Sequence, residues 1–302
     1  MNIYFIIKPI GAHGLRKLRQ SIESIFYKKK YTVFVLHTQK KGHAIALTQK
    51  AVLEKADLVV ACGGDGTINE VAQVLVETEI PLAIVPLGSG NGIARHFKIP
   101  LSVSEALKII KKNQLSEMDV GVVNGHYFFG NMGCALESHF IRKYQKNQWH
   151  GILAYGIAFM GALMRFKHQR LQIEFQKERR EIRPFVLLIS NTNQQGYNFT
   201  LTPKAQSDDG LMDLFWMEKS NSFNKIKFIN NALLKRELTS EGCNLYRLSN
   251  LTISLLSPGD YCVQIDGEYL PVASKKLEIK VLPKKLNVIV RYDQSETTHS
   301  KN

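Results

Sequence analysis

The chain has little cysteine, and the four cysteines it has show no metal-binding or disulfide pattern. They stand at positions 62, 134, 243 and 262 of 302 residues, without a C-x-x-C pair among them. This spacing argues against a zinc site and against a disulfide framework, and it fits a protein of the reducing cytoplasm.

Long apolar runs are also scarce. The most helix-like uncharged apolar stretch, residues 151–164, is too short to span a bilayer. It is expected to form a helix, either in the core or along an acyl-chain pocket, and the sequence leaves both interpretations open. Residues 1–8 lack the basic start and the long apolar core of a signal peptide, so they are expected to form the first strand.

Acidic residues are outnumbered, with 26 Asp and Glu against 40 Lys and Arg and a formal net charge of +14. Such a basic surface attracts anionic substrates, nucleic acid or acidic lipid headgroups. The basic clusters are dispersed and no nucleic-acid-binding signature accompanies them, so nucleic acid is not expected as a partner. Peripheral association with an anionic membrane is the expected use of this charge, and a homodimer is left open.

The first 120 or so residues alternate between strand and helix. The expected strands cover residues 3–8, 31–37, 57–62 and 81–86, and the expected helices cover residues 14–29, 41–54, 67–77, 91–96 and 103–112. This alternation predicts an α/β, doubly wound nucleotide-binding domain over residues 1–122.

After Met118 the pattern changes to short β-like runs. These cover residues 120–123, 127–131, 171–175, 185–190, 214–217, 251–255, 261–265, 277–281 and 288–292, with helices expected across residues 151–164 and 222–235. The pattern predicts a C-terminal β-sandwich domain with helical insertions over residues 123–292, whose last strand is free to return to the first domain. The polar tail, residues 293–302, is expected to be disordered.

A glycine turn follows the third expected strand. Gly63 and Gly64 leave room for a ligand near the backbone and permit positive φ, and Asp65 stands at the tip of the turn. Thr67 is expected to cap a helix that begins near Ile68. A strand, a glycine turn and a helix N-terminus together form a phosphate site, and the Asp65 carboxylate adds a group that holds a divalent cation or orients a hydroxyl.

A second glycine turn follows the fourth expected strand. It reads Leu87-Gly88-Ser89-Gly90-Asn91-Gly92, about 25 residues after the first turn, and a helical stretch comes after it. Two phosphate-type loops at the ends of two strands of a parallel sheet predict one shared nucleotide site.

These two loops carry a family resemblance. Gly-Gly-Asp-Gly-Thr-x-Asn-Glu-Val, followed by Pro-x-Gly-Ser-Gly-Asn-x-x-Ala, resembles the catalytic domain of the diacylglycerol kinase and sphingosine kinase superfamily. Three further elements follow the family's order, namely Thr38-x-x-x-Gly42-His43-Ala44, Asp208-Asp209-Gly210-Leu211-Met212-Asp213 and Asp266-Gly267-Glu268. NAD kinases and phosphofructokinases share the Gly-Gly-Asp-Gly element but not the second loop.

The resemblance implies an ATP-dependent lipid kinase that uses Mg²⁺ and phosphorylates a lipid hydroxyl at a membrane surface. Asp65 and the late acidic pair would carry the transfer, with Glu268 as proton acceptor and Asp266 assisting. An Asp-Gly pair is also typical of an ordinary hairpin turn. Lys8 stands where the family usually has Asn. The residues implied to bind the nucleotide are Lys8, Thr38, Gly63, Gly64, Asp65, Gly66, Thr67, Asn69, Glu70, Gly88, Ser89 and Asn91.

The bacterial relatives also imply a structural magnesium ion. Its ligands here would be the Gln206 side chain, the Asp209 carboxylate and the Leu211 carbonyl oxygen, with Asp213 in support. Oxygen ligands of this kind suit magnesium. The neutral Gln206 predicts modest affinity.

The acceptor is left open between diacylglycerol and a sphingoid-type lipid. Glu137 is a candidate for the acidic residue that sphingosine kinases use for the substrate amine. Two other functions compete with the lipid kinase: a soluble NAD kinase-like enzyme, and a non-catalytic module that binds nucleotide or anionic membrane.

Overall fold

The computed structural model describes residues 1–27, 30–146, 166, 168–195, 200–218, 242–258, 261–272 and 274–291. The helices expected at 151–164 and 222–235 and the tail 293–302 lie outside these residues. The strands are β1 Asn2–Ile7, β2 Thr32–His37, β3 Leu58–Gly63, β4 Leu82–Pro86, β5 Leu115–Val123, β6 His126–Phe128, β7 Asn131–Gly133, β8 Leu171–Phe175, β9 Glu178–Ile182, β10 Pro184–Ser190, β11 Met212–Glu218, β12 Cys243–Leu248, β13 Asn250–Leu255, β14 Tyr261–Ile265, β15 Glu268–Val272 and β16 Lys276–Ile289. The helices are α1 Ala12–Phe26, α2 His43–Leu53, α3 Asp65–Leu75, α4 Gly92–His96, α5 Val103–Lys112 and α6 Leu136–Lys146.

The chain divides into two compact units. Unit 1 comprises residues 1–88, 94–117 and the chain from Leu286 onward, and unit 2 comprises residues 89–93 and 118–285.

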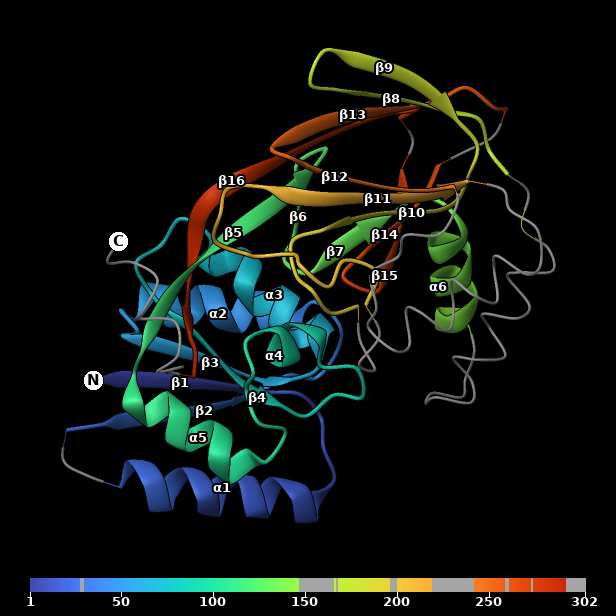
Figure 1. Cartoon of the computed structure of the whole chain (residues 1–302). Helices are drawn as coiled ribbons and strands as arrows, with labels where there is room; N and C mark the ends of the chain where they lie inside the picture. Colours follow the sequence, from blue (N-terminus) through green and yellow to red (C-terminus); the bar gives the residue numbers. More distant parts are fainter. Residues whose placement is uncertain are drawn as a thin grey trace, which may run out of the picture. The chain divides into compact units, whose positions relative to one another are not determined.

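Unit 1 is built on a parallel sheet. Its strands follow the order β2-β1-β3-β4, and the end of β16 joins beside β4, where Val288 pairs with Leu82 in parallel. Helices α1 and α5 cover one face of this sheet, and α2 and α3 cover the other (Figure 1). The expected doubly wound domain is therefore confirmed.

The alternation of side chains along each strand explains why both faces need a cover. On β1, Ile3, Phe5 and Ile7 belong to a core that includes Leu18 of α1 and Leu107 of α5. The intervening β1 residues face the other way and are also buried. A strand that is apolar on both faces is typical of a parallel sheet between two helical layers.

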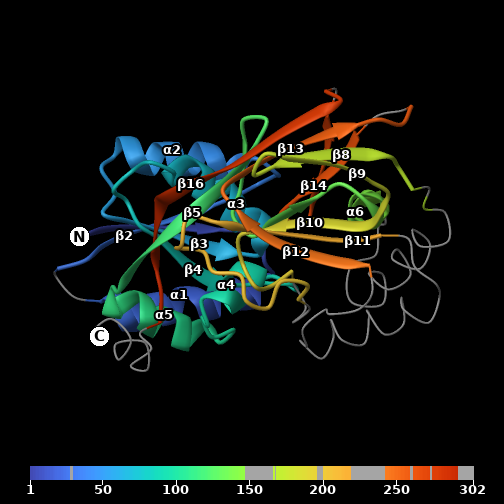
Figure 2. The same cartoon turned by 45° about the horizontal axis from the view of Figure 1, so that its top comes forward.

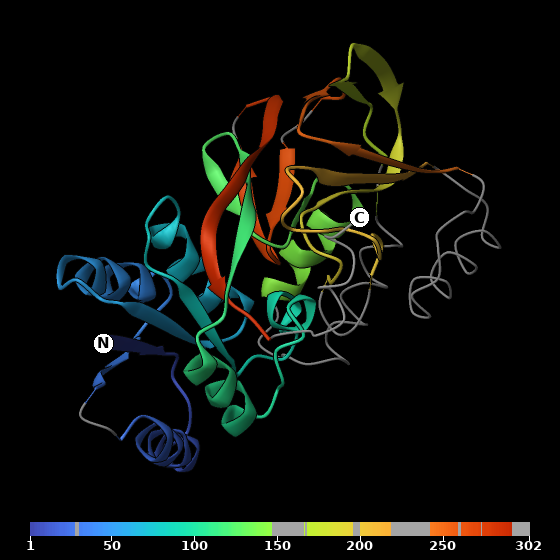
Figure 3. The same cartoon turned by 60° about the vertical axis from the view of Figure 1, so that its left-hand side comes forward.

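Unit 2 contains a two-sheet sandwich. In one sheet, β16 pairs with β13 and β5, and β13 continues to β8 and β9; the green β5 and the red β16 lie side by side in Figure 3. The other sheet has the order β12-β11-β10-β7-β14-β15, and Figure 2 shows β10, β11 and β12 as neighbours. Both sheets contribute to one buried core, for example Ile173 and Ile253 from the first and Leu187 and Trp216 from the second. The expected β-sandwich is confirmed.

The last two expected strands are a single strand, which corrects the prediction. β16 runs through Pro283 without ending, although proline usually marks an edge or a break in a strand. Lys284 adopts a left-handed φ of 53° and its N–H donates to the Asp119 carboxylate at 2.8 Å. The strand continues past this residue to Ile289.

Other element predictions were incomplete. The run expected at 127–131 is two strands, β6 and β7, and four elements had not been predicted at all: α6, β9, β12 and β15. Strand β9 carries mostly charged residues, so it has no apolar pattern to reveal it.

Candidate active site

Four predicted elements lie at the carboxyl edge of the unit 1 sheet. Lys8 follows β1, Thr38 follows β2, Gly63 ends β3 and Leu87-Gly88 follow β4. The parallel ladder continues through these ends, because Lys8 N–H donates to the Cys62 carbonyl at 3.0 Å and Thr38 N–H to the Ile7 carbonyl at 2.9 Å. We call Lys8, Thr38, residues 63–67 and Gly88 the glycine edge.

The two glycine turns touch within unit 1. A Cβ atom placed on Gly64 would lie 3.1 Å from the Gly88 Cα atom, and the Leu87 N–H donates to the Gly63 carbonyl at 2.7 Å. Gly63 is crowded from the other side, since a Cβ there would lie 2.4 Å from the Thr67 side chain. A Cβ at Gly63 would collide with Thr67, and one at Gly64 would force the Gly88 backbone to shift by a few tenths of an ångström.

Positive φ is not the reason for these glycines, contrary to the sequence-based expectation. Gly64 has φ −97° and ψ −172°, which is extended backbone, and neither Gly63 nor Gly64 is among the residues with positive φ. Helix α3 begins at Asp65, and its N-cap is Gly64. The predicted cap by Thr67 is therefore wrong: Thr67 lies inside the first turn, over Gly63.

The start of α3 has the properties of an anion site. The N-cap glycine brings no side chain to the first-turn N–H groups, and Asp65 to Thr67 are half-buried. Aligned peptide dipoles add a partial positive charge at this end of the helix. Lys8 is also half-buried, and this burial lowers the pKa of its ammonium group.

Glu70 links two of the predicted elements. Its Oε1 accepts a hydrogen bond from Gly42 N–H at 2.7 Å, and its Oε2 accepts one from Ala44 N–H at 3.0 Å. These donors belong to the start of α2, whose N-cap Gly42 has a left-handed φ of 81° and no side chain. Glu70 thus positions the Thr38–Ala44 loop relative to α3.

The rest of the second loop groups with unit 2. Ser89 is exposed, whereas Asn91 is 3% exposed and has a left-handed φ of 51° just before α4. Asparagine tolerates this conformation better than most residues.

The late acidic element is a two-residue hairpin between β14 and β15. Ile265 pairs with Glu268, and the two loop residues Asp266 and Gly267 have φ of 48° and 81°. Positive φ at both positions defines the turn that suits the strand twist. We call Asp266, Gly267 and Glu268 the acidic hairpin.

The two carboxylates of the acidic hairpin have different surroundings. Asp266 is 9% exposed and accepts hydrogen bonds from the N–H groups of Phe129, Gly130 and Asn131 at 2.7–2.9 Å. Its own N–H donates to the Asn131 carbonyl at 2.8 Å. Asp266 therefore has a clear structural function, while Glu268, half-buried at the start of β15, is the better candidate for chemistry.

Buried polar residues that the sequence did not single out support the acidic hairpin. Asn191 donates its side-chain amide to the Phe129 carbonyl at 3.0 Å, and Gln264 accepts the Gly267 N–H at 2.9 Å. Asn191 comes directly after a fully buried strand, and a polar residue at such a strand end is the signal that could have revealed it.

The predicted magnesium turn is occupied by protein groups. Asp209 Oδ1 accepts the Leu211 N–H at 3.0 Å, and Asp209 Oδ2 pairs with the Arg247 guanidinium. Gln206 is exposed. Over the described ranges, no group of three His, Cys, Asp or Glu side chains could hold a metal ion. These surroundings do not fit a further cation at Asp209.

Glu137 lies in the first turn of α6, against the second sheet of unit 2. Its Oε1 accepts hydrogen bonds from the N–H groups of Ala135 at 3.0 Å and Leu187 at 3.2 Å, while its buried Oε2 has no partner. Burial raises the pKa of this carboxyl to about 7.

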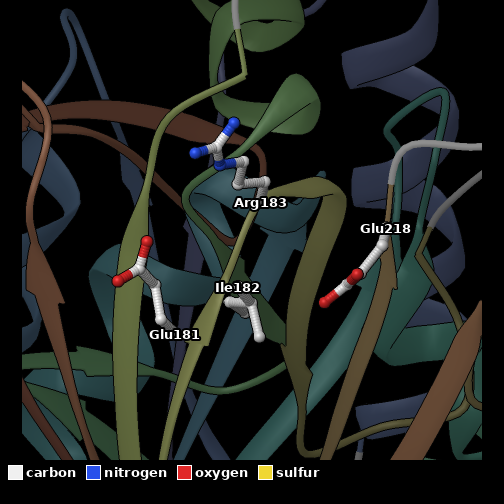
Figure 4. Close-up of a pocket in the computed structure, with 4 residues that line it drawn as sticks. All are labelled: Glu181, Ile182, Arg183 and Glu218. Carbon is white, nitrogen blue, oxygen red and sulfur yellow. The ribbon is translucent and has the colours of Figure 1, made fainter.

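Two pockets in the described part of the chain have linings that include none of the predicted site residues. One, of about 350 Å³, is lined by Glu181, Ile182, Arg183 and Glu218, and Figure 4 shows Ile182 between the two glutamates. The other, of about 850 Å³, lies between α1 and β2 and includes Phe26. No helix among the residues with described positions is long and apolar enough to cross a membrane.

Comparison with known proteins finds two matching protein families, which together cover most of the chain. Residues 2–123 match the family described as diacylglycerol kinase catalytic domain, and residues 130–290 match the YegS C-terminal NAD kinase beta sandwich-like domain. A protein of Pectobacterium atrosepticum named probable lipid kinase YegS-like is 30% identical over 89% of this chain and 90% of its own. A Staphylococcus aureus diacylglycerol kinase is 28% identical over 80% of this chain and 78% of its own. The crystal structure of a Bacillus anthracis diacylglycerol kinase shares the fold, with a TM-score of 0.74 over 96% of both chains at 20% identity.

Proposed function

Since this chain belongs to the superfamily of diacylglycerol kinases and YegS-like lipid kinases, we propose that it is an ATP-dependent lipid kinase that transfers the γ-phosphate of ATP to a lipid hydroxyl. The observation that carries this proposal is the glycine edge. There the two glycine turns pack so closely that a Cβ atom on Gly64 would lie 3.1 Å from the Gly88 Cα atom, beside Asp65 and a helix start whose N-cap residue has no side chain. Phosphoryl transfer depends on such a cradle far more than on covalent chemistry by the protein.

In this proposal the glycine edge binds the triphosphate. First-turn N–H groups of α3 point along the helix axis toward the anion, and Lys8 and Thr38 approach it from the neighbouring strand ends. Ser89, Asn91 and Asn69 complete the nucleotide contacts. Mg²⁺, when bound with ATP, would neutralise charge on the phosphates, and the Asp65 carboxylate is the oxygen ligand that suits it.

We propose that Glu268 accepts the proton of the lipid hydroxyl. The lipid hydroxyl oxygen forms a bond to the γ-phosphorus, the bond from that phosphorus to the β–γ bridging oxygen breaks, and ADP leaves. The hydroxyl proton passes to the Glu268 carboxylate. Asp266 contributes by holding the turn, since its carboxylate already accepts three backbone N–H groups.

The lipid acceptor brings the membrane into the proposal. A protein with a formal net charge of +14 is attracted to an anionic cytoplasmic leaflet, by about 1 kcal/mol for each basic residue near the surface. We propose peripheral association with that leaflet. Diacylglycerol is the first acceptor to test, because it is the substrate named for the S. aureus relative.

A nucleotide acceptor is the second candidate. It is favoured by the match of residues 130–290 to a domain described as NAD kinase beta sandwich-like. The two candidates differ only in the acceptor, so a direct competition between acceptors separates them.

The test is transfer of radiolabelled phosphate from ATP with Mg²⁺. Diacylglycerol and sphingoid bases in mixed micelles, and NAD in solution, are offered to the wild type and to Asp65→Ala. Labelled lipid from the wild type alone is the expected result. Labelled NAD would replace the lipid proposal with the second candidate. ATP or liposome binding by folded protein without transfer to any acceptor would point to a non-catalytic module.

A further inference from the structure

We infer that the Arg247 guanidinium is the fixed cation of the Asp209 turn and takes the place in which the family resemblance implies a magnesium ion. The strand register puts Arg247 there. In the β11–β12 ladder Arg247 lies directly opposite Asp213, and opposite charges in directly facing positions attract.

The guanidinium reaches Asp209 in the turn and Asp213 near the start of β11. It pairs with Asp209 Oδ2, and its Nε lies 3.4 Å from Asp213 Oδ1. The Asp213 side chain is only 4% exposed, the Asp209 side chain 22% and the Arg247 side chain 46%. Arginine suits this task because its planar fork presents several donors at once and stays charged.

The opposite side of the turn is held by a buried aspartate. Asp119 is fully buried, and its Oδ2 accepts the Gly210 N–H at 2.6 Å while its Oδ1 accepts the Lys284 N–H at 2.8 Å. The Asp119 N–H donates to the Ser207 carbonyl at 2.6 Å. The turn is thus fixed by protein groups on both sides.

The donor set is also poor for magnesium. Both Asp209 oxygens are engaged, by the Leu211 N–H and by Arg247, and Gln206 is an exposed neutral side chain. A cation at Asp209 would have to displace the guanidinium and would meet its positive charge nearby.

Thermal unfolding of the nucleotide-free full chain, in EDTA and in excess Mg²⁺, tests the inference. We expect the wild-type melting temperature to be the same in both. Arg247→Gln leaves the buried Asp213 and its neighbour Asp209 without their guanidinium, so its melting temperature should fall by several degrees in EDTA and recover in part with Mg²⁺. The recovery should vanish in the double variant Arg247→Gln, Asp209→Asn. Arg179→Gln, which breaks an exposed arginine–glutamate pair, is the matched control and should change little.

Two outcomes would overturn the inference. One is a rise of several degrees with Mg²⁺ in the wild type that Asp209→Asn abolishes, since a cation bound to the folded state stabilises by mass action. The other is an Arg247→Gln variant no less stable than Arg179→Gln. If Arg247→Gln does not fold, the comparison of wild type with Asp209→Asn decides alone.

Discussion

The glycine edge and the acidic hairpin use backbone and side chain in opposite ways. At the glycine edge the closest contacts are made by residues without a side chain. Gly63 lies against the Thr67 side chain, and Gly64 lies against the Gly88 backbone. At the acidic hairpin a side chain fixes the turn, since the Asp266 carboxylate accepts hydrogen bonds from three backbone N–H groups. A phosphate cradle has to offer donors to a ligand, whereas a rigid turn has to use its acceptors internally.

The largest effect is expected at Asp65. Asp65→Ala removes the carboxylate of the glycine edge but keeps a residue that forms helix well, so the fold should persist. We expect phosphate transfer to fall by at least about 100-fold, the range seen when an electrostatic group of an active site is removed. Activity and melting temperature measured on the same preparation check this. Wild-type activity in Asp65→Ala would contradict the proposal that the glycine edge takes part in phosphate transfer.

The next prediction compares the two carboxylates of the acidic hairpin, with a structural function for Asp266 and a chemical one for Glu268. Asp266→Asn turns one oxygen that accepts N–H groups into an NH₂ donor, and we expect a loss of about 2–3 kcal/mol in the free energy of unfolding. Glu268→Gln should leave that free energy nearly unchanged and lower transfer by about 100-fold or more. Urea unfolding together with initial rates measures both. Equal stability loss in the two variants would contradict the division of roles.

A third prediction concerns pH. Burial raises the pKa of Glu137 from 4.5 to about 7, so between these values the unfolded carboxyl ionises while the folded one keeps its proton. The free energy of unfolding should therefore fall as pH rises from 4.5 to 7, by up to about 3 kcal/mol, and flatten above 7. Glu137→Gln should lose this slope in urea unfolding curves, and the exposed Glu105→Gln should keep it. If the pH dependence of the free energy of unfolding is unchanged in Glu137→Gln, then titratable groups other than Glu137 cause it.

The smallest effect is expected at the contact between the two glycine turns. Gly64→Ala puts a Cβ at 3.1 Å from the Gly88 Cα, a backbone atom that has to move by a few tenths of an ångström. We expect a cost of about 1 kcal/mol in stability and a higher KM for ATP with a smaller change in kcat. Gly11→Ala is the control, because nothing lies within 4 Å of its new Cβ. Identical kinetics for the two variants would show that the contact is not needed for the nucleotide.

Local patterns predicted the fold class and the strand ends well. Buried strands followed by glycines gave the positions of Gly63 and Gly88, because a parallel sheet aligns the ends of its strands, whereas Lys8 was implied by the family resemblance. The start of α3 was misplaced because threonine is a favoured cap, whereas in the structure Gly64 is the N-cap and Thr67 packs over Gly63 inside the first turn. The runs at 277–281 and 288–292 were expected as separate strands, whereas β16 continues through Pro283, next to the hydrogen bond between Lys284 and Asp119.

The contacts that specify the site were beyond local patterns. Asp266 binds backbone groups more than 130 positions earlier, and Asp209 meets an arginine 38 positions later. Such pairs depend on strand order and register, which spacing along the chain does not encode. The resemblance supplied roles for these residues but not their neighbours.

The two hydrogen bonds of Glu70 have a consequence for how a nucleotide would arrive. With both oxygens accepting N–H groups at the start of α2, this carboxylate holds the loop after Thr38 through protein contacts alone. An incoming nucleotide would find that loop already in position, so less ordering entropy opposes binding. Alanine at position 70 would weaken nucleotide affinity through loosened scaffolding, without any requirement that the glutamate touch the nucleotide.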